Sequence, residues 1–143
     1  MNWEKWEILR EVVRDIPPEK WHYSRWVVTL RDRAGSICGT KCCAFGAYVL
    51  RDMPAGYRDP YDYFSQRVSE MSGVVPLGIA TIAAREFDIS YDEARDLFCN
   101  VVALESVLSP AAFLAAMDWI ESLHRKKEKE NRCPQLAIPR AQE

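Results

Sequence analysis

The sequence predicts an all-α protein: a single compact bundle of five to six helices over residues 1–132, followed by a loose C-terminal tail over residues 133–143. Apolar residues recur at helical spacing in several separate segments, and proline or serine stands where helices would begin. A chain of 143 residues also has the size of one domain, which buries about 70% of its unfolded surface. One stretch, near residues 22–32, departs from the helical pattern, and we expect it to be irregular or to form a single strand.

The first helix is expected to run from Trp3 to about Ile16. Asn2 is a suitable N-cap, because its side chain can accept one of the unpaired N–H groups of the first turn. The residues spaced for one apolar face are Trp6, Leu9, Val13 and Ile16. Two consecutive prolines then end the helix, since a residue before proline avoids the helical conformation.

The central helix is expected over residues 40–53, with Thr40 as its N-cap. Apolar residues form two stripes on it, and a helix that is apolar on both belongs inside a bundle. These residues are Cys43, Gly46, Ala47 and Leu50 on one stripe and Cys42, Phe45, Val49 and Met53 on the other. Just before it, residues 26–30 have strand-like composition but no evident partner strand, and residues 31–35 are typical of an exposed turn.

Four more helices are expected in the second half, over residues 60–71, 76–87, 91–98 and 110–123. Prolines stand at the first helical position of three of them, where the missing N–H costs nothing. Ser90 begins a capping box with Glu93, and Ser109 caps the last helix. We place Trp119 at the edge of that helix's core face.

The composition, 48% hydrophobic and 28% charged with a net charge of −2, is typical of a globular protein without a general attraction to nucleic acid. No apolar run is long enough to predict a transmembrane helix. The five cysteines are an odd number, which favours reduced thiols in a cytoplasm over a disulfide framework.

A motif of the form Cys-Gly-Thr-x-x-Cys-x-x-Gly lies at the start of the expected central helix. Its fixed positions are Cys38, Gly39, Thr40, Cys43 and Gly46. In this motif, and in the pattern of helices over roughly residues 16–124, the chain resembles a family of small bacterial and phage proteins. The resemblance implies a compact helical domain in the cytoplasm of a bacterial host cell, and it implies no particular reaction. We interpret the five motif residues as structural.

Cys43 is the candidate for a catalytic thiol, because an N-terminal helical position lowers the pKa of a cysteine, with His22 as the candidate base. Cys43 also lies on an expected core stripe, and buried cysteine commonly acts as a small hydrophobe. We therefore expect no catalytic residue here. Metal sites normally show two pairs of ligands, and the cysteine spacing provides no second pair, so neither a metal nor another cofactor is expected.

Charged residues gather in two further places. Four carboxylates near the start of the helix at residue 91 are expected to complement its dipole rather than to perform acid–base chemistry: Asp88, Asp92, Glu93 and Asp96. The basic run at residues 124–132 also contains acidic residues, so it indicates a solvated helix end.

Aromatic residues are abundant, and some of them lie beside an arginine in one loop. Tyr57, Arg58, Tyr61 and Tyr63 are of the types that anchor protein interfaces, and we predict that they bind a protein partner. The sequence is thus interpreted as a non-catalytic interaction or regulatory protein, such as a phage-encoded inhibitor of a host complex. A thiol-dependent enzyme using Cys43 and a nucleic-acid-associated accessory factor stay open as alternatives.

Overall fold

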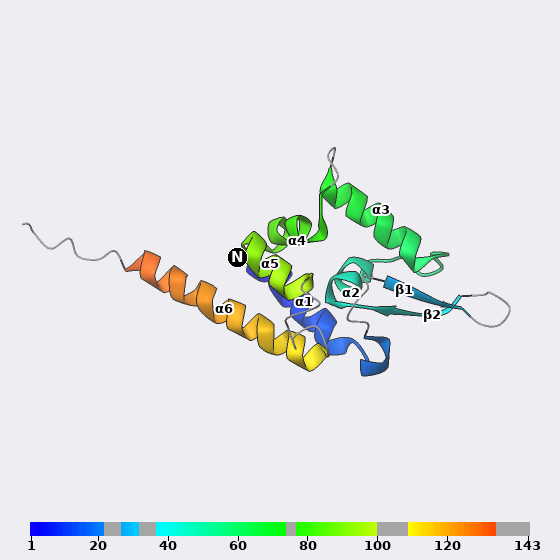
Figure 1. Ribbon diagram of the computed structural model, residues 1–143, viewed down its shortest axis with the longest axis horizontal. Coiled ribbons are helices and arrows are strands. Elements are labelled where there is room, and N and C mark those ends of the chain that lie inside the picture. The colour runs from blue at the N-terminus through cyan, green and yellow to red at the C-terminus, as the bar shows by residue number, and fades with distance from the viewer. Residues whose placement is uncertain (22–26, 32–36, 74–76, 100–108, 134–143) are drawn as a thin grey trace, which may run out of the picture.

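A computed structural model describes residues 1–21, 27–31, 37–73, 77–99 and 109–133 of the chain. Over these residues six α-helices pack against one another, which confirms the predicted helical bundle (Figure 1). They are α1 (Trp3–Asp15), α2 (Ala44–Leu50), α3 (Pro60–Ser72), α4 (Ile79–Phe87), α5 (Tyr91–Phe98) and α6 (Pro110–Arg132). A short 3-10 helix, η1 (Pro18–Lys20), follows α1. The predicted loose tail after residue 133 lies outside the described residues.

The core forms around α1, which contacts α2, α4 and α6. The predicted inward face of α1 is confirmed at Trp6, Leu9 and Val13, which are fully buried, whereas Ile16 is the half-buried C-cap residue after the helix. Phe87 of α4 lies at the centre of an aromatic cluster, with ring centroids 6.0 Å from Trp6 and 4.9 Å from Tyr48. Edge-to-face contacts of this kind add about 0.5–1.5 kcal/mol per pair to the burial itself.

The predicted helix caps are confirmed at three sites. Asn2, Ser90 and Ser109 each accept a backbone N–H from the third residue that follows, at 3.1 Å in every case. Each such cap stabilises its helix by about 1 kcal/mol. The helix expected from Pro76 instead begins at Ile79, with Gly78 as its cap, and Pro76 itself lies outside the described residues.

One of the two alternatives predicted near residues 22–32, a single strand, is present, but the expectation that it has no partner strand is wrong. Strand β1 (Val27–Arg31) pairs antiparallel with strand β2 (Ile37–Cys42), so that Thr29 lies opposite Thr40. The missed partner is the Cys-Gly-Thr segment, whose glycine and threonine were interpreted as a helix start. β-branched residues in both segments favour an extended backbone, and the nearby valine-rich strand supplies the hydrogen-bond partner.

The prediction that Thr40 caps a helix over residues 40–53 is therefore also wrong. The backbone is extended through Cys42, and α2 begins only after its N-cap residue, Cys43. The shorter helix is buried on several sides, at Ala44, Phe45, Gly46, Tyr48 and Val49. Of the predicted stripes, Ala47, Leu50 and Met53 are only half-buried, and the buried Ala44 and Tyr48 were not among them. A helix of seven residues depends on such packing, since it is too short to be stable alone.

The long helix α6 is attached to α1 by polar contacts along its length. Trp3 donates its indole N–H to Glu128 at 2.8 Å, and the Arg125 guanidinium lies 4.4 Å from the Trp3 ring centroid. Closer to the start of α6, Arg10 binds Asp118 and Glu121. The C-terminal end of α6 extends from one end of the molecule, and the β1–β2 hairpin extends from the other (Figure 1).

Candidate partner-binding groove

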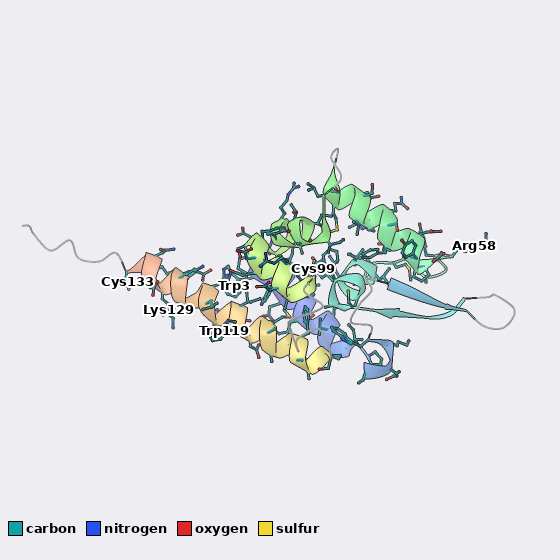
Figure 2. The ribbon with its side chains drawn as sticks, viewed as in Figure 1. Trp3, Arg58, Cys99, Trp119, Lys129 and Cys133 are labelled. Carbon is teal, nitrogen blue, oxygen red and sulfur yellow. The ribbon has the colours of Figure 1, made fainter. Side chains whose placement is uncertain are left out.

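The predicted partner-binding residues lie around the start of α3, and the structure separates them into two groups. Tyr57 and Tyr63 pack edge to face with centroids 5.1 Å apart, and the Tyr57 hydroxyl donates to Gln66 at 3.1 Å. Tyr63 is buried, so it serves the fold. Tyr61 is 55% exposed, and Arg58 is exposed at an extremity of the molecule (Figure 2).

Cys43, the candidate nucleophile, is only 9% exposed and packs in the hydrophobic core. It lies at the N-cap of α2, not in the first turn as predicted. Its suggested base, His22, lies outside the described residues, so the structure does not place the two relative to each other. Among the residues that the structure describes, no three metal-ligating side chains gather at one point.

The basic run at the end of α6 is partly used in holding the helix. His124 lies 2.7 Å from a Glu93 carboxylate oxygen, and Arg125 binds both Glu121 and the Trp3 ring. Beyond them exposed lysines alternate with glutamates. The surface there is of mixed charge.

A groove of about 390 Å³ lies between α5 and α6, at residues that the sequence interpretation did not assign to a site. Each of its two walls consists of residues that recur at helical spacing. On α6, Ala116, Trp119 and Leu123 follow one another at intervals of three and four residues, and on α5 Asp92 and Asp96 are four apart. The buried side chains of Leu97 and Ile120 form the floor.

Trp119 is the most exposed large apolar residue of the described chain, at 67% (Figure 2). Leu123, one turn further along the same face of α6, is 36% exposed. The eight residues of α5 span about 12 Å, against about 35 Å for the 23 residues of α6, so α5 cannot cover the whole face. The predicted position of Trp119 at the edge of the core is confirmed, and the edge borders a hollow.

The charged side chains that line this groove are all acidic: Asp92, Glu93 and Asp96. Their basic or imidazole partners lie outside the lining. Arg95 is shared between Asp92 at 3.4 Å and Asp96 at 3.2 Å, and Glu93 faces His124. Asp92 and Asp96 keep 77% and 49% of their side-chain surface exposed, so both can meet an incoming cation.

The sequence contained a signal for this groove that was assigned to other causes. The acidic residues do begin α5 as predicted, and Asp92 and Glu93 lie in its first turn. What could not be foreseen is that α5 packs antiparallel to α6, with its acidic start near His124, because that orientation depends on tertiary packing. A tryptophan one turn from a leucine, at the border of the apolar face of α6, was the available hint.

A second hollow, of about 310 Å³, lies where α1, α2, α3 and α4 meet, and it is polar. The buried Tyr48 hydroxyl donates to Glu86 at 2.8 Å, and Lys5 pairs with the same carboxylate at 3.1 Å. Burial raises the pKa of Tyr48, and the hydrogen bond to Glu86 raises it further. The cations that line it, Lys5, Arg51 and Arg67, each have a carboxylate partner. The contacts of Lys5 and Tyr48 with Glu86 are the ones that join helices, namely α1, α2 and α4.

Comparison with known proteins adds no evidence on the role of this site. No family model, curated protein or solved structure matches this chain. The likeness of its Cys-Gly-Thr motif to a bacterial and phage family therefore stays a prediction. Within the described part of the chain, none of the helices combines the length and the apolar character needed to cross a membrane.

Proposed function

We propose that this protein acts by binding another protein through the groove between α5 and α6. The observation that carries the proposal is the exposure of Trp119 on the wall of an apolar hollow. Burying an exposed tryptophan against a partner is among the largest single contributions to binding, and tryptophan is enriched at the energetic centres of interfaces.

The walls and floor of the groove have the anatomy of an interface. An apolar centre, formed by Trp119, Leu123 and Ala116 over Leu97 and Ile120, is bordered by polar residues on one side. Interfaces generally combine an apolar core with a polar rim. A regulatory role, such as inhibition of a host complex, is the form of action that the sequence predicts, and it belongs to this proposal.

A second candidate surface is the one predicted from sequence. Tyr61 and Arg58 are both exposed beside the start of α3, and tyrosine and arginine are favoured interface residues. Figure 2 places Arg58 far from Trp119, so a variant at one surface leaves the other intact. The groove is preferred because Trp119 adjoins a hollow that a partner side chain can fill.

The test is quantitative affinity capture from bacterial lysate with matched variants. Trp119→Ser removes the aromatic wall of the groove, and Tyr61→Ser removes an aromatic residue of similar exposure from the other surface. We expect proteins captured by the parent chain to be lost with Trp119→Ser and retained with Tyr61→Ser. Both substitutions are at exposed positions and should change stability by no more than about 0.5 kcal/mol, which thermal unfolding checks.

Loss of the captured proteins with Tyr61→Ser alone would assign partner binding to the surface at the start of α3. Equal capture by the parent chain and by both variants would contradict binding through either surface. Both outcomes are distinguishable from a folding defect, because unfolding curves and circular dichroism spectra of the variants are recorded in parallel.

A further inference from the structure

We infer that the part of the partner that fills the groove is a basic amphipathic helix. This inference rests on the proposed function and adds the chemistry of the ligand. Its apolar face carries large side chains that enter the groove beside Trp119. Its flanking lysines or arginines meet the carboxylates of α5.

The shape of the groove favours a helix over a small molecule. Small-molecule sites bury most of their ligand, typically 70–90% of its surface. Here Trp119 and Leu123 stay 67% and 36% exposed, so the α6 wall faces solvent along a full helical turn. A surface of this kind between two helices suits a third helix, whose apolar side chains recur at three- and four-residue intervals like those of the wall.

The charges that line the groove favour a positively charged ligand. Three carboxylates and no cation line it, although Arg95 and His124 lie behind them. An acidic helix would place like charges beside Asp92 and Asp96, which is unfavourable, whereas lysine or arginine would pair with them. Arg95 divides its charge between two carboxylates, and each keeps about half or more of its side chain exposed for another partner.

The exposed ring of Trp119 adds a second feature that favours cations. Tryptophan has the most favourable aromatic face for a lysine or arginine side chain within about 6 Å of its centre. The chain already uses this interaction elsewhere, where Arg125 lies 4.4 Å from the Trp3 ring centroid. A basic residue at the border of the partner's apolar face can therefore contact Trp119 and a carboxylate of α5 together.

Three synthetic helical peptides of about 18 residues, roughly five turns, test the inference. They share one leucine face and differ in the polar face, which carries lysine, glutamine or glutamate. Isothermal titration against the full chain should give the tightest binding for the lysine peptide and the weakest for the glutamate peptide. Raising salt from about 0.05 M to about 0.5 M should reduce the advantage of the lysine peptide, since it shortens the Debye length.

Matched variants locate the effect. Asp92→Asn and Asp96→Asn should each weaken binding of the lysine peptide by about two- to fivefold and leave binding of the glutamine peptide unchanged. Asp62→Asn, which removes an exposed carboxylate of α3, should change neither. Trp119→Ser should weaken binding of both the lysine and the glutamine peptides, because they share the apolar face.

Other outcomes overturn the inference in separable ways. Equal binding of all three peptides with dependence on Trp119 would reject the charge preference but keep the groove as a binding site. Binding of none would reject a helical ligand, while the capture experiment still decides the proposed function. A concentration-dependent dimer that is lost with Trp119→Ser, measured by analytical ultracentrifugation, would assign the groove to a second copy of this chain instead.

Discussion

The hydroxyl of Tyr48 in α2 donates a hydrogen bond of 2.8 Å to the carboxylate of Glu86 in α4, although the Tyr48 side chain is only 1% exposed. Lys5 of α1 binds the same carboxylate, and the Arg51 guanidinium lies 3.9 Å from the centroid of the Tyr48 ring. Glu86 thus joins α1, α2 and α4, and Tyr48 contributes its hydrogen bond only in the protonated form.

This bond predicts a loss of stability at alkaline pH. Because burial and the bond to Glu86 raise the pKa of Tyr48 above its ordinary 10.0, the folded state holds the proton more tightly than the unfolded state. The contribution is complete below about pH 10 and declines as pH rises further. Tyr48→Phe should lower the free energy of unfolding by about 1–3 kcal/mol at pH 8, with a smaller difference near pH 11. Urea unfolding at both values measures this.

Tyr61→Phe is the control, because Tyr61 is exposed. In this variant the free energy of unfolding should fall at alkaline pH just as it does in the parent chain. A decline of the same steepness with Tyr48→Phe would show that Tyr48 is not its source.

Glu121 predicts a second pH dependence, at the acidic end. Burial alone would raise its pKa, but hydrogen bonds from Arg125 and Arg10 outweigh burial and hold the pKa below its ordinary 4.5. A lowered pKa contributes stability that is present above about pH 4.5 and is lost as pH falls. Glu121→Gln should cost about 1 kcal/mol at neutral pH and almost nothing near pH 2. Glu11→Gln, at an exposed position on α1, should cost little at either pH, and a parallel loss there would contradict the assignment.

The three cysteines whose side chains the structure describes, out of five in the chain, should react in an order set by burial. Cys133 is exposed at the end of α6 (Figure 2), Cys43 is buried, and burial raises the pKa of the half-buried Cys99. We expect iodoacetamide to modify Cys133 first and the other two slowly, with similar rates for all three in urea. Peptide mapping by mass spectrometry gives each rate. A Cys43 that reacts faster than Cys133 in the native protein would revive the thiol-enzyme alternative.

The short helix α2 should be indispensable to the whole bundle. Phe45 is fully buried and contacts Phe64 of α3 and Phe98 of α5, at centroid distances of 6.3 Å and 5.6 Å. Phe45→Ala should therefore cost about 3–5 kcal/mol and destabilise all helices in one transition. Thermal unfolding followed by circular dichroism measures the cost, with Tyr61→Ala as the exposed control. A mild effect, close to that of the control, would mean that α2 does not join α3 to α5.

The parts of the fold that sequence predicted well are those fixed by local chemistry. Serine, asparagine and proline define helix starts through their own backbone contacts, so the caps at Asn2, Ser90 and Ser109 could be read directly. Thr40 shows the limit of this reasoning. Threonine after glycine suits either a cap or a strand, and only pairing with β1 decides between them.

The groove was missed for a similar reason. Trp119 was placed correctly at an edge, and the acidic residues at the start of α5 were explained by its dipole. Their convergence on one hollow results from the antiparallel packing of α5 on α6, a long-range relationship that helical spacing within either segment does not contain. Of the predicted surface residues, Tyr63 is buried and packs on Tyr57, which is itself 36% exposed.

Photo-crosslinking from position 119 in living cells tests the central claim most directly. A photoreactive phenylalanine analogue replaces Trp119 in one variant and Tyr61 in another, so that each exposed surface carries one probe. Binding through the groove predicts a discrete protein adduct from position 119 that is absent from position 61. An adduct from position 61 alone, or none from either position, would contradict it.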